Sequence, residues 1–235
     1  MKKRPLLTGA LLLLTIPALA AEPRQAVVVT TQTWSDVQGA AQRYERAAGG
    51  PWMKVGASFP VVVGKTGLGW GRGLQKTATL PGPDKQEGDG RAPAGVFPLT
   101  RAFGYDPIAV TGMPYMQLTD SVECVDDPKS VHYNTLVDSS RTAVDWDSTE
   151  HMHRSDELYR LGVFVAHNTP AVAGAGSCIF LHIWSGPDQG TVGCTAMERS
   201  DIEMLLAWLD PKKSPVLMQM PAAQYAQYRT TWNLP

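Results

Sequence analysis

Short runs of apolar and β-branched residues recur along most of this chain, and glycines and prolines separate them. Runs of about four to eight such residues between turn-forming residues are typical of β-strands. The clearest runs predict strands at residues 26–30, 59–63, 161–166, 178–183 and 215–220. Glycines and prolines at residues 67–71 and 81–84 indicate turns in the intervals between them.

Two segments have the spacing of amphipathic helices instead. The first begins at Ser35 and ends at the Gly-Gly-Pro of residues 49–51, and the second begins at Ser200 and ends at Asp210 and Pro211. Apolar residues share one face of each: Val37, Ala41 and Tyr44 in the first, and Ile202, Leu205, Leu206 and Leu209 in the second. The whole pattern predicts a mainly β fold with a few helices. We expect the aromatic C-terminal tail to pack back on this fold.

Residues 1–20 have the pattern of a secretory signal peptide. Three basic residues at positions 2–4 precede the apolar run 11–16, and an A-x-A cleavage site follows at residues 18–20. A membrane-spanning helix needs about 20 continuous apolar residues, and a proline ends this run too early. We therefore expect cleavage that leaves residues 21–235 as a single domain, without a stable membrane anchor, in the periplasm or outside the cell.

The charge of the chain argues against nucleic acid as a partner. The expected signal peptide contains three of the 21 basic residues and none of the 22 acidic ones. Without it, 18 basic and 22 acidic residues remain, a net charge of −4. No basic stripe or RNA-binding aromatic motif is present, which argues against nucleic acid as a partner. A chain of this length can bury a sizeable core within one domain.

The chain has an odd number of cysteines, Cys124, Cys178 and Cys194. Leftover thiols in an oxidising compartment tend to pair or to react. If Cys194 stays free, Cys124 and Cys178 are the candidates for a disulfide. Two buried unpaired cysteines are the alternative, because free cysteine is among the most buried residue types.

The candidate chemistry lies in one short stretch, where His182 comes near the end of an apolar run and Cys194 follows twelve residues later. An imidazole that takes the thiol proton leaves a thiolate nucleophile, which is the minimum requirement for covalent acyl transfer. Gly193 lets a carbonyl substrate approach the backbone closely, so that the N–H groups of Gly193 and Cys194 could form an oxyanion hole. We interpret the chain as an exported cysteine enzyme.

Two motifs resemble those of the L,D-transpeptidase (YkuD-type) family. Residues 87–97, EGDGRAPAGVF, are similar to the G-D-G-K/R-T-P-x-G-x-F signature that opens the family's catalytic domain. Residues 179–197 resemble its active-site segment, in which a histidine at a strand end precedes S/T-x-G-C. The resemblance extends over residues 27–221 and is weak between residues 101 and 157. It implies a β-sandwich-like catalytic domain.

Carried over to this sequence, the resemblance implies four catalytic positions. The family's nucleophile falls on Cys194, with Gly193 beside it, and the general base falls on His182. The third element of the family is the backbone carbonyl that follows the histidine, here that of Ile183, which orients the imidazole and fixes its tautomer.

The chain departs from the common family pattern on both sides of the cysteine. Many members have a histidine two residues before it and an arginine two residues after it, where this chain has Val192 and Ala196. The stretch is similar to a branch with G-C-x-A-M, in which the acceptor need not be the usual amine. The resemblance therefore defines the acyl-enzyme step better than the acceptor.

The chemistry implied by the resemblance is two-step acyl transfer on peptidoglycan stem peptides, with no cofactor. Cys194 attacks the carbonyl of the L-centre of a diamino acid, expels the D-residue and forms a thioester. An amine from a neighbouring stem then gives a 3-3 cross-link, whereas water gives carboxypeptidase or amidase activity.

Two alternatives belong to other functional classes. One is a non-catalytic wall-binding module that kept the fold and lost the activity. The other is a zinc peptidase that uses Glu150, His151 and His153, although their spacing matches no zinc-peptidase motif. We expect no metal.

Four further residues are candidates for substrate contact. Trp184 would either stack on a sugar or peptide or belong to the core. Arg91 would face the stem-peptide carboxylate, unless the glycine-rich stretch around it is only a structural turn. His167 and Asn168 would either line the rim of the cleft or satisfy local backbone groups.

Overall fold

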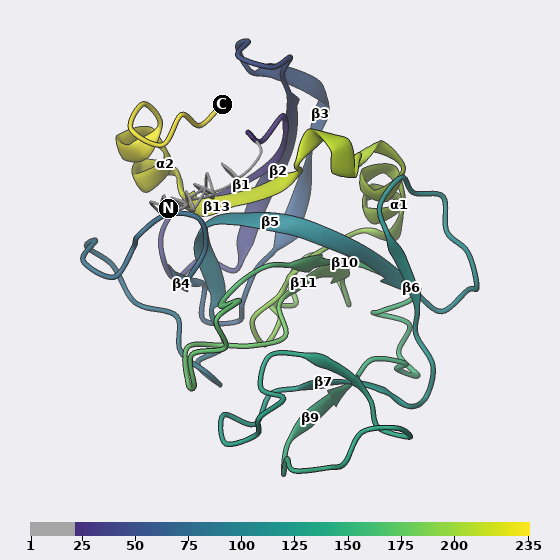
Figure 1. Ribbon diagram of the computed structural model, residues 1–235. Helices are drawn as coiled ribbons and strands as arrows, with labels where there is room; N and C mark the ends of the chain where they lie inside the picture. The colour runs from purple at the N-terminus through teal and green to yellow at the C-terminus, as the bar shows by residue number, and fades with distance from the viewer. Residues whose placement is uncertain (1–21) are drawn as a thin grey trace, which may run out of the picture.

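The largest element of the computed structural model, which describes residues 22–235, is a ten-stranded sheet (Figure 1). Its main path runs β10-β11-β12-β3-β2-β1-β13-β5-β4, and β10 also pairs with β5, which closes the path into a barrel-like wall. This arrangement confirms the mainly β fold predicted from the sequence. The strands are β1 (Gln25–Thr31), β2 (Gln38–Glu45), β3 (Met53–Val62), β4 (Leu68–Trp70), β5 (Ala92–Gly104), β6 (Tyr115–Gln117), β10 (Leu161–Val165), β11 (Phe180–Ile183), β12 (Thr195–Met197) and β13 (Val216–Pro221).

The five strands predicted from apolar runs are confirmed. They correspond to β1, the second half of β3, β10, β11 and β13. The second predicted helix is confirmed as α1 (Arg199–Trp208), which buries Ile202, Leu205 and Leu206. Because α1 packs against β10 and β11, it supports the strand that carries His182.

The helix predicted from Ser35 to residue 48 is wrong, because this segment forms β2. Strand β2 pairs with β1 on one side and β3 on the other, and Ala41 lies between Val29 and Phe59. A spacing of four residues, as between Val37 and Ala41, fits both the helical period and the alternation of a strand. Pairing with the buried strand β1 therefore determines that this segment is a strand and not a helix.

The C-terminal tail packs back on the barrel, as predicted. It contains α2 (Ala222–Tyr228), seen at the left of Figure 1. The ring of Tyr228, the last residue of α2, stacks on that of Trp232 with centroids 4.6 Å apart, and Trp70 packs edge-on against both. A short 3₁₀ helix, η1 (Pro211–Lys213), connects α1 to β13.

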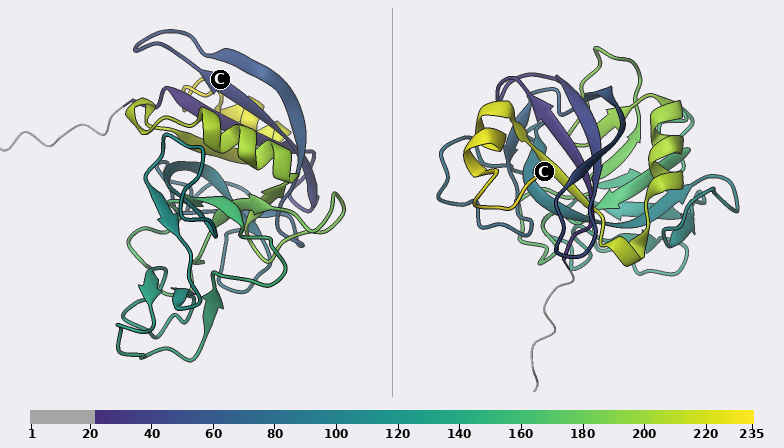
Figure 2. Two further views of the ribbon diagram at one scale, coloured as in Figure 1. Left: turned by 90° about the vertical axis from the view of Figure 1, so that its right-hand side faces the viewer. Right: turned by 90° about the horizontal axis from the view of Figure 1, so that it is seen from above.

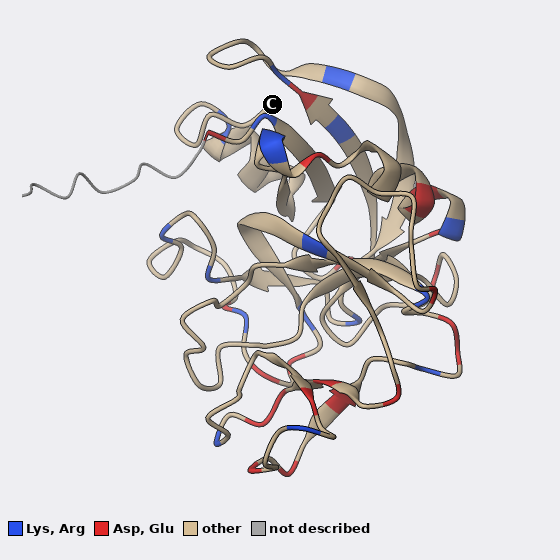
Figure 3. Ribbon diagram, turned by 45° about the vertical axis from the view of Figure 1, so that its right-hand side comes forward, with Lys and Arg blue, Asp and Glu red and all other residues tan. Residues whose placement is uncertain are grey.

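A second sheet forms a separate lobe below the barrel, made of β7 (Val122–Val125), β8 (Leu136–Asp138) and β9 (Thr149–His151) (Figures 1 and 2). We call residues 120–157, which contain this sheet, the lobe. The lobe carries ten acidic and three basic side chains, and Figure 3 shows how the acidic residues gather there. It coincides with the part of the chain in which the family motifs are weak.

A disulfide joins the lobe to the barrel. It links Cys124 of β7 to Cys178, which lies just before β11, and Cys194 is the free cysteine. Of the two alternatives that the sequence left open, the structure thus has the disulfide. Apolar residues from both parts, including Phe103, Met152 and Phe180, pack into one buried cluster around it.

The expected signal peptide, residues 1–20, lies outside the described residues. Between residues 22 and 235, no helix is long and apolar enough to cross a membrane.

Candidate active site

Cys194 and His182 lie on neighbouring parallel strands. The pairing of β11 with β12 sets His182 opposite Ala196, and Cys194 comes immediately before β12. Their residues are only 3 % and 5 % exposed, and both line one cavity of about 200 Å³. We call this the His182 cavity.

Backbone groups hold the thiol of Cys194. The N–H of Phe180 donates to Sγ at 3.3 Å, and Sγ lies 3.5 Å from the carbonyl oxygen of Cys178. Burial raises the pKa of the thiol above its ordinary value, and the charge of Glu150 raises it further. The thiol of Cys194 is therefore neutral at rest.

The imidazole of His182 is held in one tautomer. Its Nδ1 lies 2.7 Å from the carbonyl oxygen of Ile183, and a carbonyl can only accept, so Nδ1 carries the hydrogen. Burial lowers the pKa of His182 to about 4, although the bond to Ile183 opposes that shift. At neutral pH the ring is therefore uncharged, and the lone pair of Nε2 can accept a proton.

Cys194 also lines a second cavity, of about 170 Å³. Its lining includes Lys85, Gly193 and Cys194, and we call it the Lys85 cavity. Cys194, Val192 and Glu150 line both cavities. The thiol of Cys194 thus borders both cavities.

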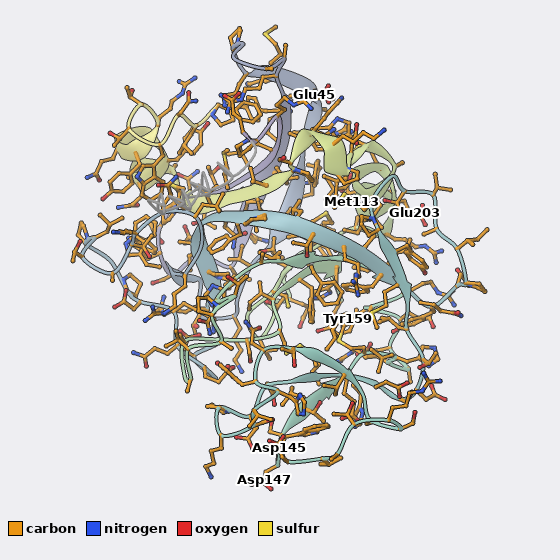
Figure 4. The ribbon with its side chains drawn as sticks, viewed as in Figure 1. Glu45, Met113, Asp145, Asp147, Tyr159 and Glu203 are labelled. Carbon is orange, nitrogen blue, oxygen red and sulfur yellow. A yellow bond between two sulfur atoms is a disulfide. The ribbon has the colours of Figure 1, made fainter. Side chains whose placement is uncertain are left out.

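Glu150 and Tyr159 bring a polar network to the His182 cavity. The hydroxyl of Tyr159 donates to Oε1 of Glu150, and the ring of Tyr159 packs edge-on against His182 with centroids 5.0 Å apart. Figure 4 shows Tyr159 between the barrel and the lobe. Arg154 lies over the Tyr159 ring at 5.1 Å. No motif in the sequence singles out Tyr159 or Arg154, and Glu150 stands out only through the two histidines near it.

Trp184 is the only one of the four predicted substrate-contact residues that lines either cavity at the nucleophile. It is half-buried and lines the His182 cavity. The guanidinium of Arg91 instead donates to the carbonyl oxygen of Leu68 at 2.8 Å and helps to hold a turn. Arg91 lines neither cavity at Cys194.

His167 and Asn168 are buried and satisfy local backbone groups, which is the second of the two roles considered for them. Nδ1 of His167 accepts from the N–H of Arg72 at 3.3 Å, and Nε2 donates to Ala175 at 3.0 Å. Asn168 donates to the carbonyl of Gly176 at 3.0 Å. These bonds engage both side chains away from Cys194.

Gly193 lines the Lys85 cavity, but its N–H is already engaged. It donates to Oγ1 of Thr191 at 3.1 Å, whose hydroxyl in turn donates to the carbonyl of Cys194 at 2.7 Å. A Cβ at position 193 would meet no atom closer than 3.4 Å, so packing alone does not demand a glycine. The absence of a side chain leaves the backbone next to the thiol open to a substrate.

The histidines considered for a metal site face single carboxylates. Nδ1 of His151 lies 3.5 Å from Glu123, and Nδ1 of His153 lies 2.5 Å from Asp120. Among residues 22–235, no three His, Cys, Asp or Glu side chains are grouped so that they could hold a metal ion.

Comparison with known proteins identifies the family. A family model for the L,D-transpeptidase catalytic domain, YkuD, matches residues 36–218. Neither a comparison with curated proteins nor one with solved structures gives a match. The matched range spans most of the chain and includes both strands that position Cys194 and His182. This protein belongs to the YkuD family of L,D-transpeptidase catalytic domains.

Proposed function

We propose that this protein is an exported cysteine acyltransferase that forms a thioester between Cys194 and a peptidoglycan stem peptide. Membership of the family supports a cysteine-dependent enzyme acting on peptidoglycan. The observation that carries the mechanism is a buried thiol in the same cavity as an imidazole whose Nδ1 is fixed by the carbonyl of Ile183. Retention of this pair favours an enzyme over a non-catalytic wall-binding module.

The first step starts from two neutral groups. As Sγ of Cys194 attacks the carbonyl carbon of the L-centre, Nε2 of His182 takes the thiol proton and the C–S bond forms. The same proton then moves from Nε2 to the nitrogen of the D-residue, whose C–N bond breaks. The products are a thioester, a neutral imidazole and a free D-residue.

The negative charge that develops on the attacked oxygen needs a donor. The N–H of Gly193 is engaged by Thr191 in the resting structure. We assign the role to the N–H of Cys194, and to that of Gly193 if the substrate displaces its bond to Thr191. His182 stays positioned throughout, because its bond to the Ile183 carbonyl does not involve Nε2.

The surroundings of the thiol favour an amine over water as acceptor. Cys194 is 3 % exposed and lies between two small cavities, which a donor and an acceptor stem would fill. Exclusion of water protects a thioester from hydrolysis. Transfer to an amine would give a 3-3 cross-link, and transfer to water would make the protein an L,D-carboxypeptidase or amidase.

Export is part of the proposal. Residues 1–20 have the pattern of a secretory signal peptide, which supports export. The Cys124–Cys178 disulfide supports an oxidising compartment such as the periplasm or the cell exterior.

Product analysis tests the proposed function. We expect the purified protein to release the terminal D-residue from a stem tetrapeptide and to form peptide dimers, as measured by mass spectrometry. A Cys194→Ala variant should do neither. Release without dimers would indicate the hydrolase, and an unchanged tetrapeptide would contradict the proposal.

A further inference from the structure

Glu150 occupies a position next to the nucleophile that the acyl-enzyme mechanism does not use. It comes from β9 of the lobe, yet it lines both cavities that open on Cys194. In β9 it pairs directly with Cys124, and the disulfide from Cys124 to Cys178 ties this point of the lobe to the barrel. The carboxylate is therefore held in place beside the thiol.

The carboxylate of Glu150 has one engaged oxygen and one open oxygen. Tyr159 donates to Oε1, and Nη1 of Arg154 lies 3.7 Å from the same oxygen. Arg154 also donates from Nε to Asp156 at 2.9 Å, so its positive charge is shared between Glu150 and Asp156. Within residues 22–235 no group donates a hydrogen bond to Oε2.

The charges around the open oxygen favour a cation. Asp126 and Glu87 line the Lys85 cavity together with Glu150, and the ammonium group of Lys85 is paired with Asp89 at 2.7 Å. The lobe as a whole is acidic, as Figure 3 shows. The lining of the Lys85 cavity therefore has an excess of negative charge, three carboxylates against one ammonium that Asp89 already pairs, and this excess would attract a further ammonium group toward Cys194.

We propose that Glu150 binds the ammonium group of the acyl acceptor and removes one of its protons before the amine attacks the thioester. This inference rests on the proposed function and names the acceptor class as a primary ammonium. Burial raises the pKa of Glu150, which makes its carboxylate a better proton acceptor than an exposed one.

Oε2 of Glu150 takes one proton from the ammonium, and the resulting amine forms a C–N bond with the thioester carbon. As the C–S bond breaks, His182 takes the second proton from the new amide nitrogen and passes it to the departing sulfur. The products are an amide and the Cys194 thiol, and the proton on Glu150 is released to solvent.

The test separates a charged acceptor from an uncharged one. The wild-type protein and a Glu150→Gln variant are acylated with stem tetrapeptide, and the thioester is then offered isotope-labelled stem tripeptide or hydroxylamine. The tripeptide carries an ammonium group and has no D-residue to expel, whereas hydroxylamine is uncharged at neutral pH. We expect Glu150→Gln to slow cross-linking to the tripeptide at least tenfold and to change the reaction with hydroxylamine less than twofold.

Controls make the result specific. Glutamine can still accept from Tyr159. Because Glu150 lines both cavities, the rate of thioester formation is measured for each variant, and transfer to the acceptor is compared per acylated protein. Glu150→Asp, which keeps the charge, should restore part of the cross-linking. Glu123→Gln is the matched control, because Glu123 neighbours Cys124 on the lobe sheet but lines neither cavity.

Two outcomes would overturn the assignment in distinguishable ways. Equal cross-linking by the wild-type protein and Glu150→Gln would overturn the role of Glu150 and leave the proposed function intact. A wild-type protein that forms no thioester at all would overturn the proposed function, and the role of Glu150 with it.

Discussion

His182→Gln is expected to slow thioester formation on Cys194 by about 10²–10⁴-fold, the usual contribution of a positioned general base. The effect is large because the thiol is neutral at rest: burial raises its pKa, so a thiolate does not form without a proton acceptor. Glutamine fills a similar space but cannot take the proton. Rapid-quench mass spectrometry of the acylated protein measures the rate.

The pH dependence of the same rate is a further part of this prediction. Burial lowers the pKa of His182 to about 4, so the ring is in its basic form at every pH above that value. The rate for the wild-type protein should therefore stay level from neutrality down to about pH 5 and fall by half near pH 4. His151→Gln, at an exposed histidine of the lobe, is the control. A His182→Gln rate within threefold of the wild type would contradict the assigned base.

The second large effect is expected from removal of the Cys124–Cys178 disulfide. The bond closes a loop with a sequence separation of 54, for which chain entropy gives about 4 kcal/mol of stabilisation. The double variant Cys124→Ala/Cys178→Ala should lose about that much free energy of unfolding. It should also lose cross-linking, because Glu150 pairs with Cys124 and depends on this bond for its place at the nucleophile.

Urea unfolding measures the loss of stability. The variant is best compared with the disulfide-bonded protein in a Cys194→Ala background, so that the free thiol cannot exchange with the disulfide. A difference below about 1 kcal/mol would show that the buried cluster around Phe103, Met152 and Phe180 holds the lobe without the bond.

Much of the barrel could be predicted from the sequence, because its central strands are runs of β-branched residues buried on both faces. The run Val27-Val28-Val29 in β1 is of this kind. Helix α1 was equally clear, since Ile202, Leu205 and Leu206 lie on one face. Strand β2 was not predictable, because its sparse apolar residues fit two periods and only its partners β1 and β3 decide between them.

The candidate site divides in a similar way. Cys194 and His182 could be proposed because both belong to one motif, and the parallel pairing of β11 and β12 brings them into one cavity. Tyr159 and Glu150 could not, because strands of three and four residues carry little periodic signal and the lobe reaches the thiol only through tertiary packing and a disulfide. The sequence could not decide the role of Arg91, since a guanidinium can hold a backbone carbonyl, as Arg91 holds that of Leu68, as readily as a substrate carboxylate.

Intact-mass spectrometry of the protein within seconds of mixing with stem tetrapeptide, followed by peptide mapping, shows which residue carries the acyl group. Cys194 acts as the acyl carrier in this account. The protein should therefore gain the mass of the tetrapeptide minus its D-residue and one water, with the adduct on the peptide that contains Cys194. Release of the D-residue by a Cys194→Ala variant at the wild-type rate, or an adduct on any other residue, would contradict the account.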